Sequence, residues 1–296
     1  MKNKSFQYGL IPLVVLLLLF ASCRKEAYVH FGEQYKKIIY IVHAEGMEYK
    51  KEHSFEKLND TIHVSVYCAT TEPPAEDVKV SFKLDTEALD SINNLNALSN
   101  ANYIPRQLLP SAYYSATELT AVIKKGAQYG VLSIPVNFSG IDPDVEYVLP
   151  LSIVTNDKGY DINAKLRTIG YQPVFINAYS GYYSGSSANE AETAPRIVSP
   201  VLKAMSRNTI RMPVHNLQDD TAFLATNYML LTIGDDQKAV SIQPYGNAKV
   251  FDEGGSTYDA ATQTFLLNYS FMNGATKVTV HEKIRDIEAI NEEETP

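Results

Sequence analysis

Three carboxylates follow one another at every second position of the stretch SGIDPDVE, residues 139–146. They are Asp142, Asp144 and Glu146. Carboxyl groups held close together can act as general acids and bases. In such an arrangement the last carboxyl would donate the proton, supported by the aspartates before it. The first question is whether this segment is a catalytic strand.

The spacing is similar to the D-G-x-D-x-D-x-E strand motif of chitinase-type barrel glycosidases, but three features oppose catalysis. Ser139 stands where that motif begins with Asp. Pro143 would remove a hydrogen-bond donor from a central strand. The chain around it also lacks the alternating strand–helix units of such a barrel, which takes about 250 residues. We therefore interpret the segment as an Asp-Pro turn that precedes a strand.

Aromatic residues suggest a second kind of site, because the chain has 20 tyrosines and no tryptophan. Tyrosine suits a sugar-binding surface, since its ring is apolar and its tip is polar. The candidates lie in AYSGYYSGSS and in two later segments: Tyr179, Tyr182, Tyr183, Tyr245 and Tyr258. Along a strand Tyr179 and Tyr183 share one side and Tyr182 faces the other, so these three cannot form one flat platform. The alternative is that the rings pack in a core and that AYSGYYSGSS is the first strand of a second domain.

An acidic loop, FDEGGSTYD, is a weak candidate for calcium. It brings Asp252, Glu253 and Asp259 near loop hydroxyls, and oxygen-rich loops suit this ion. The alternative is a glycine-rich hairpin loop without metal.

Other catalytic and cofactor patterns are absent from the sequence. The histidines have no close zinc spacing, and no glycine-rich loop opens a helix. We therefore expect no cofactor and no catalytic residue. Cys68 shares one strand face with Ile62, Val64 and Val66, which predicts a buried thiol.

The N-terminus resembles a bacterial lipoprotein signal. Lys2 and Lys4 precede an apolar run that is too short to span a membrane. The segment LFASC resembles a lipobox, and this resemblance implies that Cys23 is acylated and becomes the first residue of the mature chain. The alternative is an ordinary secretory signal.

Charge argues against nucleic acid as a partner. The chain has 26 basic and 34 acidic residues, and removal of residues 1–22 takes the net charge from −8 to −10. No basic patch remains to follow a phosphate backbone.

Most of the chain shows the alternation and turn punctuation of an all-β protein. In the first half, strands are expected at 37–43, 61–68, 77–84, 118–124, 130–138 and 145–154. In the second half, strands are expected at 208–217, 227–234, 239–246, 262–271 and 276–284. One helix is expected over 85–96, because Ala88, Leu89, Ile92 and Leu95 recur at helical spacing. A boundary is expected near residues 170–181.

Four segments in order resemble the N-terminal domain, of uncharacterised function, of lipoproteins from polysaccharide-utilisation loci. They are VKVSFKLDTEALDSINN, NYIPRQLLPSAYYS, AVIKKGAQYGVLSIPV and YVLPLSIVTNDKGYDIN. The segments YSGYYSGSS and IQPYGNAKVFDEGGSTYDAATQTFLLNYSF look like the C-terminal domain that accompanies it. The resemblance implies an immunoglobulin-like β-sandwich followed by a lipocalin-like antiparallel β-barrel. The expected divisions are a signal peptide (1–22), an anchor segment (23–27), the sandwich (28–172), a linker (173–178), the barrel (179–285) and an acidic tail (286–296).

The same resemblance implies a function at the cell surface. We expect a non-enzymatic outer-membrane lipoprotein that binds glycan or assists its uptake with an outer-membrane transporter, and that meets the membrane only through its lipid. One alternative is a structural or protein-interaction component of an outer-membrane complex. Another is a hydrolase with an unrecognised carboxylate site.

Overall fold

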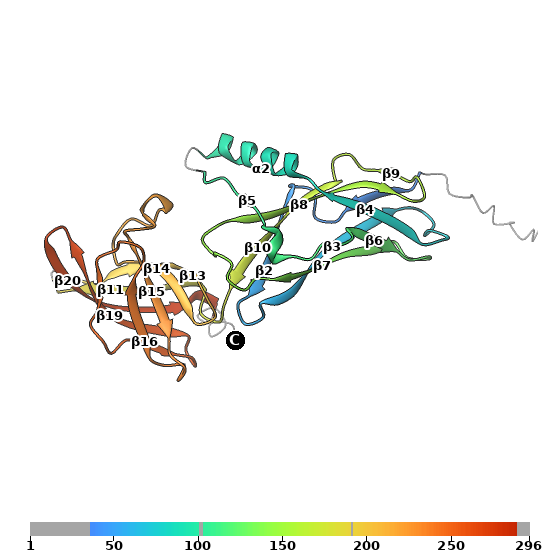
Figure 1. The fold of residues 1–296 in the computed structure, drawn as a ribbon. Coiled ribbons are helices and arrows are strands. Elements are labelled where there is room, and N and C mark those ends of the chain that lie inside the picture. Colours follow the sequence, from blue (N-terminus) through green and yellow to red (C-terminus); the bar gives the residue numbers. More distant parts are fainter. Residues whose placement is uncertain (1–35, 101–102, 191, 289–296) are drawn as a thin grey trace, which may run out of the picture.

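A computed structural model describes residues 36–100, 103–190 and 192–288. Figure 1 shows two β units side by side, a sandwich coloured blue to green and a barrel coloured yellow to red. The expected fold class, an all-β sandwich followed by an antiparallel barrel, is confirmed. Within the described residues, no helix has the length and apolar character needed to cross a membrane.

The sandwich has two sheets. The first has the order β7-β3-β1-β9, formed by β7 (Tyr129–Asn137), β3 (Asn59–Ala69), β1 (Ile38–Ile41) and β9 (Asp161–Ile162). The second has the order β2-β10-β8-β4-β6, formed by β2 (Glu48–Ser54), β10 (Thr168–Ile176), β8 (Tyr147–Asn156), β4 (Val78–Leu84) and β6 (Thr120–Ile123). A short strand, β5 (Gln107–Leu108), pairs with β8, and a 3₁₀ turn, η1 (Ser111–Tyr113), follows it.

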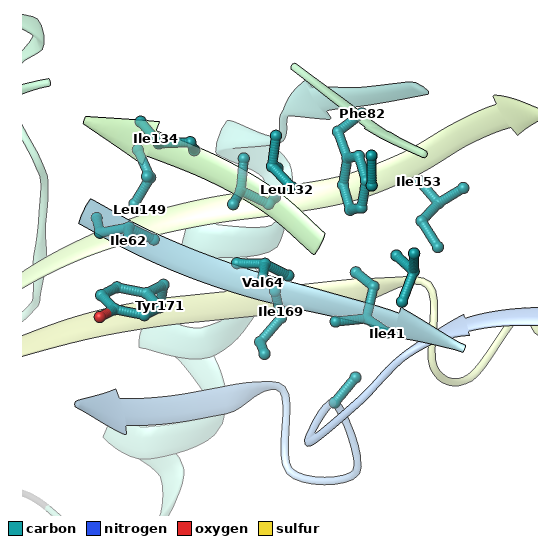
Figure 2. Packing of buried hydrophobic residues seen from close by; sticks show 14 of the residues in the cluster. Ile41, Ile62, Val64, Phe82, Leu132, Ile134, Leu149, Ile153, Ile169 and Tyr171 are labelled. Carbon is teal, nitrogen blue, oxygen red and sulfur yellow. The ribbon is translucent and has the colours of Figure 1, made fainter. Parts of the chain in front are cut away.

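Strict alternation explains why these strands pack as a sandwich. Along β7 every second residue is buried, and β3 buries Ile62, Val64, Val66 and Cys68 on one face. Figure 2 shows side chains from both sheets, such as Leu132 and Tyr171, pointing into the space between them. Full burial of one such aliphatic side chain contributes about 1.5–3 kcal/mol. The thiol of Cys68 is inside this core, as predicted.

The helix α2 (Thr86–Ser99) covers the outer face of β8. Leu89 and Ile92 pack on Val148, which explains why β8 is buried on both faces. The expected helix is therefore confirmed. Leu95, however, is 58% exposed, because the apolar stripe ends one turn earlier than its spacing suggested.

The connection between the domains begins later than expected. Residues 173–176 are not linker but the end of β10, which pairs in parallel with β2 as far as Ile176. Pro173 is tolerated because the ladder to β8 ends at Tyr171, so one side of β10 is an edge from there on.

The barrel is antiparallel, with the strand order β16-β15-β14-β13-β11-β20-β19-β17. Its strands are β11 (Gly181–Asn189), β12 (Arg196–Val198), β13 (Val201–Ala204), β14 (Thr209–Pro213), β15 (Tyr228–Ile233), β16 (Val240–Pro244), β17 (Val250–Asp252), β18 (Thr257–Asp259), β19 (Thr264–Asn273) and β20 (Thr276–Asp286). A 3₁₀ turn, η2 (Thr221–Phe223), lies between β14 and β15. β19 buries Phe265, Leu267, Tyr269 and Phe271, the face that its alternation predicted.

The two ends of the barrel sheet almost meet. A single bridge joins Ala239 to Thr257, and the amide of Ile242 donates to the Asp252 carboxylate at 2.9 Å. A side chain thus takes the place of a main-chain acceptor where the sheet closes.

Candidate functional site

Two of the five candidate tyrosines are core residues. Tyr183 and Tyr258 are 1% and 6% exposed, and both rings lie against Phe265. Tyr179 is partly buried and meets the Tyr258 ring edge-on, with centroids 5.1 Å apart. The expectation that Tyr183 and Tyr258 offer their faces to a sugar is therefore wrong, because the interior of the barrel covers them.

The remaining two candidates lie apart from each other. Tyr182 is 68% exposed on the opposite side of β11 from Tyr183, as alternation predicted. Tyr245 is half-buried, and its hydroxyl donates to Asp144 of the sandwich. The structure does not bring the five tyrosines together.

The three calcium candidates do not converge either. Asp252 accepts from the amides of Gly254 and Ile242, Glu253 pairs with Lys277 at 2.7 Å, and Asp259 accepts from Thr262 at 2.8 Å. Among the residues with assigned positions, no group of three or more His, Cys, Asp or Glu side chains could hold a metal. The loop is an insertion between β17 and β18, which pair with the same strand β19. The loop therefore bulges out between two strands that pair with β19. It is not the glycine-rich hairpin that the sequence offered as the alternative to a calcium site.

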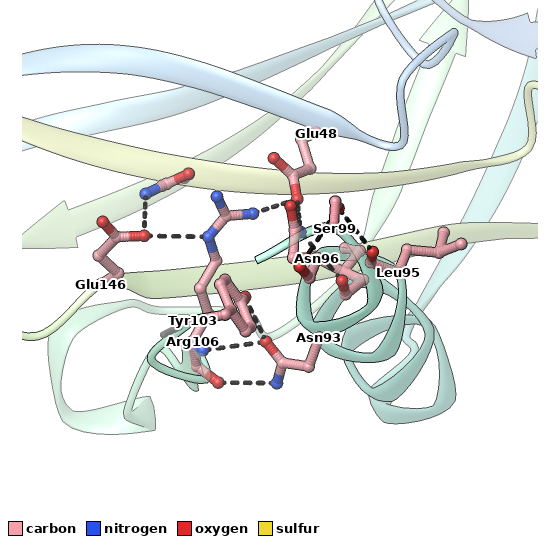
Figure 3. Close-up of polar contacts among 10 residues, drawn as sticks. Glu48, Asn93, Leu95, Asn96, Ser99, Tyr103, Arg106 and Glu146 are labelled. Atoms are coloured by element: carbon pink, nitrogen blue, oxygen red, sulfur yellow. Dashed lines mark hydrogen bonds and ion pairs between the residues drawn. The ribbon is translucent and has the colours of Figure 1, made fainter. Parts of the chain in front are cut away.

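The carboxylates of SGIDPDVE diverge. Asp142 accepts from the amide of Asp144 at 2.9 Å, which is the Asp-Pro turn that the sequence favoured. Asp144 faces the barrel and accepts from Arg211 and Tyr245. Glu146 pairs with Arg106 at 3.1 Å (Figure 3). With separate partners, these groups form no acid–base pair.

A different set of tyrosines forms a row on the outer face of the first sheet. Tyr40 lies opposite Tyr67, and Tyr67 lies opposite Tyr129, so one ring comes from each of β1, β3 and β7. Ring centroids are 5.4 and 4.6 Å apart, and successive planes are tilted by 59° and 54°. We call these three residues the tyrosine row.

The row is open to solvent. Tyr129 is 60% exposed, while Tyr40 and Tyr67 are half-buried by one another and by their neighbours. Burial, together with the nearby Tyr67 and Tyr129, raises the pKa of Tyr40. The Tyr40 hydroxyl is therefore uncharged at neutral pH. Val131, 47% exposed, extends the apolar surface along β7.

A cleft of about 290 Å³ lies beside the row. β1 ends at Ile41, opposite Val66, so the earlier part of β3 has no strand neighbour on that side. The cleft occupies this gap between β3 and β2. His63 and Ser65 line it, and they lie on the same face of β3 as Tyr67 because they precede it by four and two residues. His63 and Ser65 therefore connect the row to the cleft along one face of β3.

A hydrogen-bonded chain forms the wall of the cleft. His53 Nδ1 lies 2.9 Å from Asp60 Oδ2, and its Nε2 lies 2.8 Å from the Tyr171 hydroxyl. Burial lowers the pKa of His53, although Asp60 opposes this. Burial alone would raise the pKa of Asp60, but hydrogen bonds from the Thr61 amide and from His53 hold it below its usual value.

These shifts fix the protons of the chain. A neutral His53 beside a carboxylate must donate from Nδ1, because the carboxylate is only an acceptor. Nε2 then accepts from the hydroxyl of Tyr171, whose pKa burial raises. Both imidazole nitrogens are engaged, so this histidine has no free nitrogen for proton transfer to a ligand. The arrangement suits binding.

A second ring pair lies at the mouth of the cleft. His43 and Tyr49 stack with centroids 5.2 Å apart and planes within 7° of each other. Both residues line the cleft, with Lys51 and Glu52 nearby. The surface therefore combines aromatic faces with imidazole, hydroxyl, ammonium and carboxylate groups, which fits a polyhydroxylated ligand.

Family models cover both halves of the chain. A model described as an N-terminal domain matches residues 35–159, and a model described as a C-terminal domain matches residues 168–285. The chain carries both of these family domains. Curated proteins give no match.

Solved structures from Bacteroides share the two-domain fold. A protein of unknown function from Bacteroides ovatus has a TM-score of 0.62 at 17% identity, over 83% of this chain and 90% of that one. A multidomain protein from the same species has a TM-score of 0.62 at 16% identity, over 86% and 93%. An auxiliary nutrient binding protein from Bacteroides thetaiotaomicron has a TM-score of 0.56 at 16% identity, over 81% and 89%. At these identities the likeness concerns the fold.

Sequence reasoning missed the tyrosine row because no local pattern marks it. Each ring is a single tyrosine in its own strand, 27 and 62 residues apart in the chain. Each stands on the outward face of its strand, but only the face of β3, with His63 and Ser65, is polar. Only the register of β1, β3 and β7 places them in line.

Proposed function

We propose that the protein is a non-enzymatic outer-membrane lipoprotein that binds glycan on its sandwich domain and assists glycan uptake. The observation that carries this proposal is the exposed tyrosine row beside a polar cleft.

The geometry of the row suits a carbohydrate chain. Neighbouring strands lie about 4.8 Å apart, so three rings extend across roughly 10 Å of the sheet. Each ring presents an apolar body to sugar C–H groups and a hydroxyl to water or to sugar hydroxyls. Because successive rings are tilted, the surface favours a chain of several sugar units that turns from one ring to the next.

The cleft supplies specificity. A ligand lying along β3 passes from Tyr67 to Ser65 and His63, where hydrogen-bonding groups replace rings. A few placed polar groups beside an apolar surface are the usual composition of a binding site. The likeness to an auxiliary nutrient binding protein supports the same class of function.

The membrane part of the proposal depends on Cys23, which lies outside the described residues. Twelve residues separate Cys23 from Lys36, the first described residue, and a chain of this length spans at most about 42 Å. Palmitate labelling that is lost in Cys23→Ser tests this anchor, and labelling that persists in the variant contradicts it.

The binding test is affinity gel electrophoresis with a panel of neutral and acidic polysaccharides. We expect retardation by at least one polysaccharide, and Tyr129→Ala should weaken it about tenfold or more, because a few aromatic side chains carry most of the binding energy of an interface. Tyr182→Ala is the matched control, because this tyrosine is similarly exposed but lies on the barrel and not in the row. Retardation that is equal in wild type and Tyr129→Ala would refute a role for the row.

The same variant distinguishes glycan binding from the second candidate function, which is contact with a protein partner. Exposed Val131 beside the row would also suit a protein partner. Co-purification with an outer-membrane transporter that Tyr129→Ala abolishes, without retardation by any polysaccharide, would make the row a protein contact instead.

A further inference from the structure

The interior of the barrel is apolar except at one end. The buried cluster consists of aliphatic and aromatic side chains, yet Ser187, His215 and Glu282 are also buried there. Ser187 on β11 lies opposite Glu282 on β20, and both point inward by alternation. His215, which follows β14, closes this end with an imidazole nitrogen 2.7 Å from the Ser187 hydroxyl.

Hydroxyl groups of neighbouring side chains form hydrogen bonds with the buried Glu282 carboxyl. The Tyr269 hydroxyl donates to Glu282 Oε2 at 2.8 Å, and Ser187 also hydrogen-bonds to this carboxyl. Burial nevertheless raises the pKa of Glu282 to about 7. Among the residues described, no lysine or arginine pairs with it. A carboxyl in this state gains stability from any cation that can reach it.

A cavity of about 220 Å³ reaches this carboxyl from outside. Its wall includes the turn between β12 and β13, with Ser199 and Pro200, and the segment after β14, with Leu217 and Asp219. Asp219 is exposed at the rim and accepts from the Tyr228 hydroxyl. Two carboxyl groups and one imidazole line the cavity, with no lysine or arginine.

We propose that this cavity binds a small ligand through a primary ammonium group, with Glu282 at its floor and Asp219 at its rim. The apolar walls and the volume limit the ligand to about one sugar ring. Because the proposed function is glycan binding, the matching ligand is an amino sugar, and this choice of ligand rests on the proposed function. The cavity belongs to the barrel, so the tyrosine row takes no part in it.

The proposal is tested by calorimetry of the full chain with glucosamine, methylamine and glucose at pH 7. We expect heat from glucosamine and from methylamine but not from glucose. Because burial raises the pKa of Glu282, binding of an ammonium group should release protons, seen as a dependence of the heat on the ionisation enthalpy of the buffer. Glu282→Gln should weaken binding about tenfold or more, since it removes a charge-assisted contact.

Two control variants separate this site from others. Glu253→Gln removes a carboxylate elsewhere on the barrel and should leave the heat unchanged. Tyr129→Ala should also leave it unchanged, so a failure of polysaccharide binding and a failure of amine binding are distinguishable. Equal heat from glucose, no heat from either amine, or undiminished binding by a folded Glu282→Gln each overturns the proposal. The last two outcomes would make the cluster a structural hydrogen-bond network.

Discussion

Exposure of a tyrosine in this protein depends on which side of its strand it occupies. Tyr183 and Tyr129 both stand on strands, yet one is 1% and the other 60% exposed. Tyr183 lies on the face that includes Ser187 and points into the barrel, whereas Tyr129 alternates with buried residues of β7 and points out. The number of tyrosines therefore says little about binding. The side of the strand on which each tyrosine stands determines whether its ring is accessible to a ligand.

At the same scale, His53 makes stability depend on pH. Burial lowers its pKa in the folded protein, whereas the unfolded chain titrates near 6.5. As the pH falls below 6.5 the unfolded chain takes up the proton first, so stability present above that pH is lost on acidification. We expect His53→Gln to lower the free energy of unfolding by about 1–3 kcal/mol at pH 7.5, because it breaks the chain from Asp60 to Tyr171. Between pH 7.5 and pH 5.5 the free energy of unfolding of His53→Gln should fall by less than that of wild type.

Urea unfolding at the two pH values measures this difference. His63→Gln is the matched control, because it removes an exposed imidazole from β3 and leaves the chain from Asp60 to Tyr171 intact. A His53→Gln curve parallel to wild type across the range would show that His53 does not cause the loss.

At the scale of elements, close strand contact in the barrel depends on Gly185. A Cβ on this residue would lie 1.9 Å from the carbonyl oxygen of Lys283 on β20, a backbone atom that cannot rotate away. Gly185→Ala should therefore destabilise the β11–β20 pair by about 3 kcal/mol, as for overpacking in a tight core. Gly46→Ala is the control, because nothing lies within 4 Å of its added Cβ. Equal thermal midpoints for the two variants would contradict this account.

Strands with clean alternation could be predicted from the sequence, and others could not. β7 and β19 alternate apolar and polar residues, so their positions and buried faces were correct. β2, with the sequence EYKKEHS, was missed because its residues are mostly charged and it is a sheet edge beside β10. Pro173 suggested a break in β10 because the end of the β8 ladder, which makes a proline harmless there, is a tertiary feature.

The same limit applies to the sites. The turn at Asp142 follows from local chemistry and was predicted correctly. The tyrosine row and the Glu282 cavity each join residues of several strands, and their assembly depends on register. For strands that alternate cleanly, the sequence indicates the buried face, but it does not indicate which rings will be neighbours.

At the scale of the whole molecule, Asp144 joins the two domains. Its carboxylate accepts from Arg211 and Tyr245 of the barrel and lies 3.3 Å from Lys203. The Arg211 guanidinium lies between the rings of Tyr228 and Tyr245, 5.2 and 4.9 Å from their centroids. Burial would raise the pKa of Asp144, but these donors hold it below its usual value. The domains should therefore keep one orientation near neutral pH.

Asp144→Ala tests this junction, because it leaves the buried Arg211 charge without its carboxylate. Loss of one partner from a buried ion pair costs about 3–5 kcal/mol, enough to uncouple the domains. We expect one calorimetric unfolding transition to become two, and the radius of gyration from X-ray scattering to increase. Glu56→Gln removes an exposed ion pair to Arg207 across the same junction and should cost at most about 1 kcal/mol. A single transition with an unchanged radius in Asp144→Ala would mean that other contacts, such as Asn177 with the carbonyl groups of Ser206 and Thr209, hold the domains together.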